Sequence, residues 1–123
     1  ARLGTAEIYS VVDKFKEVKE SIVIGQKWDN DVRIILFVVL KKPKSLNEDL
    51  SFNLKKAIRK DASPRHVPKK IIEVSDIPRT KNGKIVEIAV RNTVEGIKIK
   101  NIQALINPNI LNEFKNLDEL KTP

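Results

Sequence analysis

Cysteine and methionine are both absent from the 123 residues of this sequence. Without cysteine the chain can form no disulfide, no thiolate metal site and no cysteine nucleophile. This composition suits a reducing compartment, and we expect a cytoplasmic protein. The fold must therefore be held together by packing and hydrogen bonds, for which a chain of this length has enough buried surface.

Long apolar runs and aromatic residues are also scarce. No run approaches the ~20 residues of a membrane span, and the N-terminus has no basic-then-apolar signal pattern. Aromatic residues make up 5% of the chain, which leaves few side chains to stack on bases. The GxxG clamp of KH modules is missing as well. We expect neither a membrane nor a nucleic acid as partner.

Positive charge is abundant, since 24 Lys and Arg outnumber 16 Asp and Glu and give a net charge of +8. Such a balance favours anionic partners, including nucleotides, nucleic acids and acidic surfaces. It is equally compatible with a lysine-rich solvated surface. A stand-alone basic α+β module that binds nucleic acid therefore remains an alternative.

The spacing of apolar residues predicts an α+β fold: a small three-stranded sheet flanked by helices, with a hairpin and a C-terminal helical extension. The run at residues 32–40 is apolar almost throughout and predicts a central strand buried on both faces. Shorter strands are expected at 21–25 and 70–74. The predicted helices cover residues 5–18, residues 45–60 with a capping box of Ser45 and Glu48, and an amphipathic stretch from Ile110. The stretch after Lys84 that ends at Gly96 is compatible with a short helix, although Val86 and Val90 leave a strand possible.

The segment with the clearest local chemistry covers residues 78–85, PRTKNGKI. Asn82 and Gly83 favour a tight two-residue hairpin turn, with Lys81 and Lys84 flanking it on two paired segments. A lysine held on such a turn suits a phosphate or carboxylate oxygen on which negative charge builds up. An ordinary solvated hairpin tip is the alternative. A nucleotide P-loop is excluded by Pro78, which stands where the first glycine of that motif belongs.

This segment resembles the C-terminal signature of the adenylate-forming acyl-CoA synthetases. A second stretch, residues 2–8 (RLGTAEI), is similar to the family's segment just after the hinge between its large and small domains. The resemblance implies an enzyme that makes acyl-AMP and pyrophosphate from a carboxylate and ATP, and then transfers the acyl group to coenzyme A. Magnesium (Mg2+) would accompany the ATP. In this family the lysine that matches Lys84 reaches the acyl carboxylate and the ATP phosphate during adenylation.

The resemblance implies roles for three more residues. The family arginine that matches Arg2 lies close to the nucleotide phosphate, and Gly4 would face the pantetheine path of coenzyme A. Arg59, within residues 58–61 (IRKD), resembles an arginine placed against coenzyme A phosphate. Its guanidinium suits a phosphate through paired donors. His66 has no partner set for catalysis or metal binding in the neighbouring sequence, so a structural or surface role is expected.

Two further stretches resemble acetoacetyl-CoA synthetases in particular. They are residues 63–68 (SPRHVP), expected to be extended and non-helical, and the tail from residue 97. Acetate or propionate remain alternatives to acetoacetate. The expected division is a mobile C-terminal domain at residues 1–95 and an extension at residues 96–123 that packs on it.

The resemblance also implies a partner within the same polypeptide. A large N-terminal domain would carry the acyl pocket and most of the ATP/AMP site, so the isolated chain is not expected to be active. Because the chain opens without methionine on a helix entry, we expect that this domain precedes it. Acylation of Lys84 would remove its charge and switch off adenylation.

Overall fold

The computed structural model describes residues 4–123, so the expectation for Arg2 lies outside the described residues. The helices and strands follow one another in the order α1, β1, β2, α2, β3 and α3, with one 3-10 turn between α2 and β3 and three more after α3. The elements are α1 (Ala6–Val12), β1 (Val18–Trp28), β2 (Asp31–Leu40), α2 (Glu48–Asp61), β3 (Lys70–Glu73) and α3 (Glu87–Val94), with 3-10 turns at Pro64–His66, Ile102–Ala104, Pro108–Phe114 and Asp118–Lys121. The predicted α+β class is confirmed.

The three strands form one sheet in the order β1-β2-β3. Strands β1 and β2 are antiparallel, from the pair Val18 and Leu40 to the pair Trp28 and Asp31, whereas β2 and β3 are parallel. The middle of β2 is fully buried, with no exposed surface at Ile35, Leu36, Phe37 or Val38. The apolar run thus forms the central strand, as its sequence predicts.

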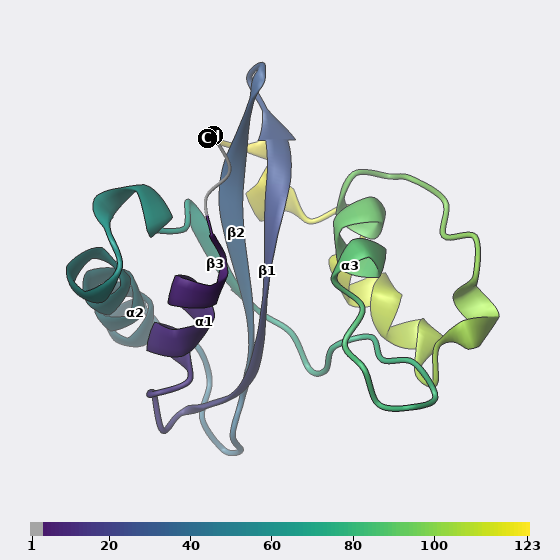
Figure 1. Cartoon of the computed structure of the whole chain (residues 1–123), viewed down its shortest axis with the longest axis horizontal. Helices are drawn as coiled ribbons and strands as arrows, with labels where there is room; N and C mark the ends of the chain where they lie inside the picture. The colour runs from purple at the N-terminus through teal and green to yellow at the C-terminus, as the bar shows by residue number, and fades with distance from the viewer. Residues whose placement is uncertain (1–3) are drawn as a thin grey trace.

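Helices cover both faces of the sheet (Figure 1). Helices α1 and α2 lie on one face, and α3 lies on the other together with the C-terminal segment. Alternate residues of β2 point to the two sides, because successive strand residues face opposite ways. Phe37 meets Phe114 of the C-terminal segment at 4.8 Å between ring centroids, in an edge-to-face arrangement. The C-terminal segment is therefore part of the hydrophobic core on the α3 side of the sheet.

The first helix is shorter than the predicted range of residues 5–18. It ends at Val12, because Lys14 and Phe15 donate their backbone N–H groups to Val11 and Val12 in a tightened turn. Val18 already belongs to β1 and is 7% exposed. The apolar residues at helical spacing are thus divided between a helix and the strand that follows it.

The capping prediction for α2 is wrong by two residues. Asn47, in an extended conformation, is the N-cap, and its Oδ1 accepts a hydrogen bond of 2.8 Å from the backbone N–H of Leu50. An asparagine at this position satisfies a free donor of the first turn as well as a serine would. Ser45 lies outside the helix.

Two segments adopt 3-10 turns instead of the predicted conformations. Residues 63–68 were expected to be extended, but Pro64–His66 forms one 3-10 turn, which a proline at its first position permits. The predicted amphipathic α-helix near the C-terminus is a 3-10 segment, Pro108–Phe114. Residues three apart align in a 3-10 helix, so Leu111 and Phe114 can still face the core together.

Helix α3 ends where the sequence predicts. Gly96 has a φ of +75°, and Ile97 donates its backbone N–H to Asn92 at 2.8 Å. This pattern is a glycine C-cap that closes the last turn. The chain then crosses back over the second face of the sheet (Figure 1). Within residues 4–123, no helix has the length and apolar character needed to cross a membrane.

Candidate functional site

Residues 79–85 form a hairpin that carries Lys84, and we call it the lysine hairpin. Arg79 and Ile85 form an antiparallel bridge at its base. The backbone N–H of Thr80 donates to the carbonyl of Lys84 at 2.8 Å, and that of Gly83 donates to the carbonyl of Thr80 at 2.9 Å. The loop therefore contains three residues between the paired positions 80 and 84.

The predicted two-residue turn at Asn82 and Gly83 is wrong. Gly83 has a φ of +84°, but Asn82 does not have the positive φ that such a turn requires. The observed arrangement is that of a tight turn followed by a left-handed glycine, the usual three-residue hairpin loop. In this three-residue loop the two lysines are not equivalent. Lys84 is paired with Thr80 through its backbone, while Lys81 lies in the loop.

The side chain of Lys84 is exposed, and the hairpin holds its backbone from two directions. Besides the carbonyl contact, the N–H of Lys84 donates to the hydroxyl of Thr80 at 3.2 Å. Within residues 4–123, Lys84 takes part in no ion pair. A cation on a fixed backbone with its head in solvent can meet an incoming anion without first breaking an internal contact.

The base of the hairpin is anchored to the sheet by Arg79. Its guanidinium pairs with the carboxylate of Glu20 on β1 and lies 3.7 Å from that of Asp76. Arg79 is therefore engaged within the domain, although it belongs to the same signature as Lys84. Its role here is to fix the hairpin to β1.

The segment that leaves the hairpin is tied to α1 through Tyr9. The Tyr9 hydroxyl donates to the carboxylate of Glu87, the first residue of α3, and accepts a hydrogen bond of 2.8 Å from the backbone N–H of Val23. Burial, and next the hydrogen bond to Glu87, raise the pKa of Tyr9 above its ordinary value. Tyr9, Glu87 and Ile85 line a hollow of about 380 Å³ beside the hairpin.

The other predicted site residues are not brought to Lys84. Gly4 is exposed at the start of the described chain, and Arg59 is exposed on α2. Figure 1 shows α2 on one side of the sheet and the lysine hairpin, which leads into α3, on the other. Arg59 and Lys84 thus occupy opposite sides of the domain.

His66 is held in place by its neighbours. Its Nδ1 lies 2.6 Å from the hydroxyl of Ser63, and its Nε2 lies 3.9 Å from the carboxylate of Glu7. The residue is half-buried and is the last one of the 3-10 turn Pro64–His66. These contacts agree with the structural role expected for this histidine.

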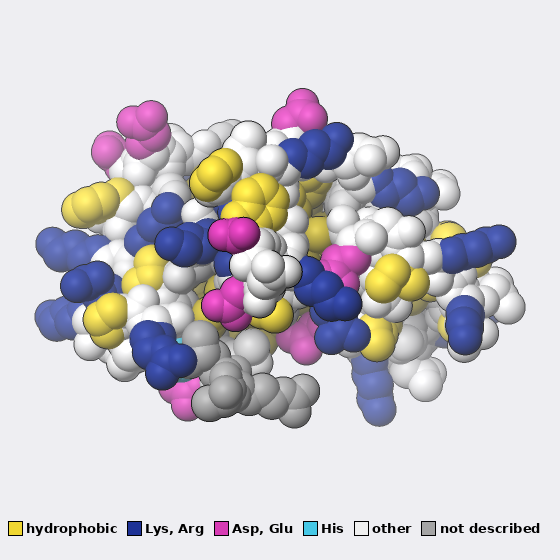
Figure 2. Space-filling view, turned by 90° about the horizontal axis from the view of Figure 1, so that it is seen from above, with side chains coloured by type: hydrophobic (Ala, Val, Ile, Leu, Met, Phe, Trp, Pro, Cys, Tyr) yellow, Lys and Arg dark blue, Asp and Glu magenta, His cyan; other side chains and the backbone are white. Residues whose placement is uncertain are grey.

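On the face shown in Figure 2, basic side chains are spread out instead of forming one patch. Figure 2 shows Lys and Arg at both ends of one face and near its centre, interleaved with acidic groups. Among residues 4–123, no cluster of three or more His, Asp and Glu side chains could hold a metal ion.

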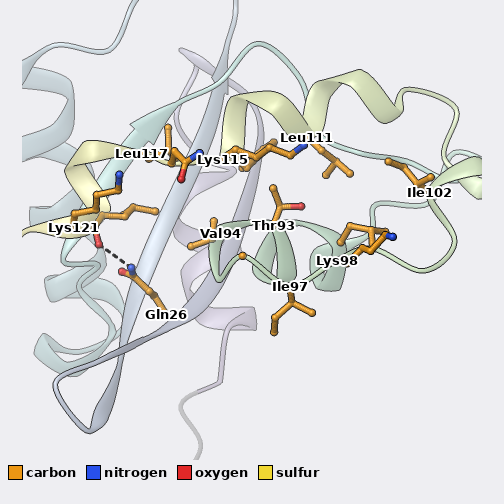
Figure 3. Close-up of a pocket in the computed structure, with 15 residues that line it drawn as sticks. Gln26, Thr93, Val94, Ile97, Lys98, Ile102, Leu111, Lys115, Leu117 and Lys121 are labelled. Atoms are coloured by element: carbon orange, nitrogen blue, oxygen red, sulfur yellow. Dashed lines mark hydrogen bonds between the residues drawn. The ribbon is translucent and has the colours of Figure 1, made fainter.

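A cavity of about 540 Å³ lies between α3 and the C-terminal segment (Figure 3). Thr93 and Val94 line it from α3, and Leu111 and Leu117 line it from the tail. None of the predicted site residues within the described chain borders it. This cavity is separate from the lysine hairpin.

Three residues that support the hairpin were missed in the sequence: Tyr9, Glu20 and Asn107. Asn107 accepts a hydrogen bond of 3.0 Å from the backbone N–H of Arg79, 28 residues earlier. No local sequence pattern links residues so far apart. Tyr9 and Glu20 also have no neighbouring proline or glycine that would signal a special local structure. They are found only when the strands and the tail are assembled.

Comparison with models of known protein families shows the family to which this chain belongs. The model of the AMP-binding enzyme C-terminal domain matches residues 7–84, more than half of the chain, and its last matched residue is the hairpin lysine. The chain belongs to this family. Its resemblance to the C-terminal domain of adenylate-forming acyl-CoA synthetases is thereby confirmed.

Individual acetoacetyl-CoA synthetases match more of this chain than the family model does. Acetoacetyl-coenzyme A synthetase from Rhizobium meliloti (strain 1021) is 55% identical over 121 residues, which cover 98% of this chain and 19% of that protein. The solved acetoacetyl-CoA synthetase from Streptomyces lividans has a TM-score of 0.85 and 34% identity, covering 99% of this chain and 19% of that one. A benzoate CoA ligase from Burkholderia xenovorans LB400 has a TM-score of 0.67 and 30% identity, but covers only 72% of this chain.

The family model and the individual relatives match different lengths of this chain, and they differ in the C-terminal segment. The chain spans about a fifth of the length of the curated relatives it matches, since it covers 19% and 18% of the first two. The family model ends at residue 84, yet the acetoacetyl-CoA synthetases match nearly the whole chain. The expected likeness to acetoacetyl-CoA synthetases is confirmed.

Proposed function

We propose that this chain is the mobile C-terminal domain of an ATP-dependent acyl-CoA ligase that converts acetoacetate, ATP and CoA into acetoacetyl-CoA, AMP and pyrophosphate. The observation that carries the proposal is the exposed Lys84, held at a fixed hairpin position within a family match that ends on it. The match to acetoacetyl-CoA synthetases over 98% of the chain favours acetoacetate over acetate or propionate.

Lys84 serves the adenylation half-reaction. When the carboxylate attacks the α-phosphate of ATP, negative charge develops on the oxygens around phosphorus and on the departing pyrophosphate. A lysine ammonium already positioned there stabilises this charge without reorganising solvent. The hairpin supports the role because it fixes the backbone of Lys84 through Thr80.

The thioester half-reaction uses the other side of the domain. Arg59 lies on α2, across the sheet from the hairpin, and would meet a coenzyme A phosphate after the domain has rotated. Gly4 would face the pantetheine, and Arg2 would lie near the nucleotide phosphate in one arrangement. Rotation would remove Lys84 from the reaction centre and make room for the thiol.

Two parts of the reaction depend on groups outside this chain. A large N-terminal domain of the same polypeptide would hold the carboxylate and most of the ATP and AMP site. Mg2+ would be carried by the ATP phosphates and would help to neutralise them. Residues 1–95 would form the mobile domain, and residues 96–123 an extension that packs on it. The protein would act in the cytoplasm.

The test measures carboxylate-dependent ATP–pyrophosphate exchange by the full-length protein that carries this chain. Lys84→Ala should lower the exchange rate with acetoacetate by roughly 10²- to 10³-fold, the usual effect of removing one preorganised electrostatic group. Thioester formation from supplied acetoacetyl-AMP should be preserved. Lys81→Ala is the matched control, because Lys81 is an exposed lysine of the same hairpin that lies in its loop, and the exchange rate of this variant should stay near that of wild type.

Scanning acetoacetate, acetate and propionate in the same assay identifies the acid. An unimpaired Lys84→Ala enzyme, or a wild-type protein that exchanges with none of many acids, would reject the ligase function.

A further inference from the structure

The C-terminal segment pairs with the lysine hairpin through an isolated β-bridge and a further backbone hydrogen bond. Leu105 forms an antiparallel bridge with Thr80, and the backbone N–H of Ile106 donates to the carbonyl of Arg79 at 2.9 Å. The arm that carries Arg79 and Thr80 therefore has a neighbour on each side. Lys84 pairs with this arm on one edge, and residues 105 and 106 pair with it on the other.

The side chain of Asn107 adds three contacts at the entrance of the hairpin. Its Oδ1 accepts from the backbone N–H of Arg79 at 3.0 Å. Its Nδ2 donates to the carbonyl of Ile77 at 2.9 Å and to the carboxylate of Asp76 at 3.3 Å. One amide thus connects Asp76 and Ile77, which lead into the hairpin, with Arg79, its first residue. An amide suits this position because it offers an acceptor and two donors.

Asn107 is itself held firmly by the core. Leu105, two residues before it, is 6% exposed, and Leu111 and Phe114, shortly after it, are 2% and 0% exposed. Pro108 follows directly and restricts the backbone. The tail therefore provides a rigid support on which the hairpin entrance rests.

We propose that Asn107 is a positioning residue for Lys84, and that the C-terminal segment holds the lysine hairpin in its adenylation geometry. The assignment rests on the proposed function and adds to it a role for residues beyond the family match, which ends at residue 84. Asn107 acts on Lys84 through a chain of contacts. Its amide binds the backbone of Arg79, the next residue is Thr80, and Thr80 pairs with Lys84 across the hairpin.

The proposal predicts an effect on one half-reaction. Charge stabilisation depends on where the ammonium lies, and a misplacement of about 1 Å can cost on the order of 10²-fold in rate. Arg59 lies on the opposite side of the sheet, so a loosened hairpin leaves it undisturbed. Adenylation should weaken while acyl transfer to coenzyme A continues.

The first test compares Asn107→Ala with wild type in the full-length protein. Hydrogen exchange at the backbone N–H groups of residues 79–84 should become at least about 10-fold faster, because the arm loses its anchor. In ATP–pyrophosphate exchange kcat should fall about 10- to 100-fold with little change in KM for ATP, and thioester formation from acetoacetyl-AMP should be preserved. Asn109→Ala is the control, since Asn109 is exposed two residues further on and should alter none of these readouts.

Asn107→Asp provides a second variant that keeps the size of the side chain. The ionised carboxyl has no donor and would lie against Asp76, so the hairpin should exchange faster at neutral pH. Protonation of the introduced carboxyl at low pH would restore an O–H donor. The ratio of variant to wild-type exchange at the hairpin should therefore fall towards one as the pH is lowered, which a purely structural loss of packing would not produce.

The outcomes separate this inference from the proposed function. Unchanged hydrogen exchange of residues 79–84 in both variants would overturn the positioning role whatever the enzyme does. Faster exchange with a wild-type kcat would also overturn it, while the ligase function would stand. A wild-type protein without pyrophosphate exchange would reject the proposed function, and this inference with it.

Discussion

The guanidinium carbon of Arg33 lies 3.8 Å from the centre of the Trp28 ring. Arg33 is only 7% exposed, and its Nε donates to Gln26 at 2.8 Å. Its two terminal nitrogens donate to the backbone carbonyls of Thr122 at 2.9 Å and Leu120 at 3.2 Å. The aromatic ring and the fork of donors make Arg33 a clamp that holds the end of the chain against β1 and β2.

We expect Arg33→Ala to release this end of the chain. Burial lowers the pKa of Arg33, but a guanidinium stays charged near neutral pH, so the variant removes a buried cation together with its hydrogen bonds. The free energy of unfolding should fall by about 2 to 3 kcal/mol, because partly buried carbonyls lose their donors. Urea unfolding measures the loss, and hydrogen exchange should rise around Leu120.

Lys56→Ala on α2 is the control for Arg33, since this exposed lysine should change stability by no more than about 0.5 kcal/mol. An Arg33→Ala variant whose tail keeps its wild-type protection would contradict the role of the clamp.

We expect Tyr9 to make stability depend on alkaline pH. Burial and the hydrogen bond to Glu87 raise the pKa of Tyr9 in the folded protein above its ordinary value of 10.0. The unfolded chain loses this proton first, so the contribution is complete below about pH 10 and is lost as the pH rises further. In Tyr9→Phe this part of the pH dependence should disappear. Tyr9 is the only tyrosine, so its ultraviolet titration reports the group directly, and a midpoint at or below pH 10 would refute the prediction.

The sequence was most informative where local chemistry decides the structure. The unbroken apolar run predicts β2 as the central strand, and Gly96 marks the end of α3, because both depend on the residues themselves. The position of Lys84 on a hairpin follows from Gly83 in the same way. The turn type does not, because it depends on which residues pair, and Arg79 is held in its pairing by the tail.

Contacts between distant segments could not be predicted from local patterns. Arg33 reads as a polar residue at the start of a strand, yet it binds carbonyls 87 and 89 residues away. Asn107 reads as the residue before a proline, yet it anchors the lysine hairpin. Each of the two side chains binds two backbone groups of a distant segment, and the sequence does not mark which backbone groups a side chain will reach.

We expect the cap of α2 to depend on Asn47 and not on Ser45. Asn47→Ala removes the hydrogen bond to the N–H of Leu50 and should lower the free energy of unfolding by about 1 kcal/mol. Ser45→Ala, two residues earlier, should leave it within about 0.5 kcal/mol of wild type. Urea unfolding of the two variants side by side measures both values, and the reverse order would restore the cap predicted from the sequence.

We expect Gly83 and Gly96 to contribute alike to stability but differently to catalysis. Gly83 and Gly96 both have positive φ values, +84° and +75°, and at each a Cβ would meet no atom within 4 Å. Alanine at either position should therefore impose only the left-handed backbone penalty of about 1 to 2 kcal/mol, seen as similar losses in urea unfolding.

The two glycines differ in what they support. Gly83 is the left-handed residue next to Lys84, so Gly83→Ala should also displace the ammonium and lower ATP–pyrophosphate exchange in the full-length protein about 10-fold or more. Gly96→Ala changes the end of α3 and should leave exchange near that of wild type, although it is equally destabilising. Equal exchange rates in the two variants would mean that the geometry of the hairpin does not limit adenylation.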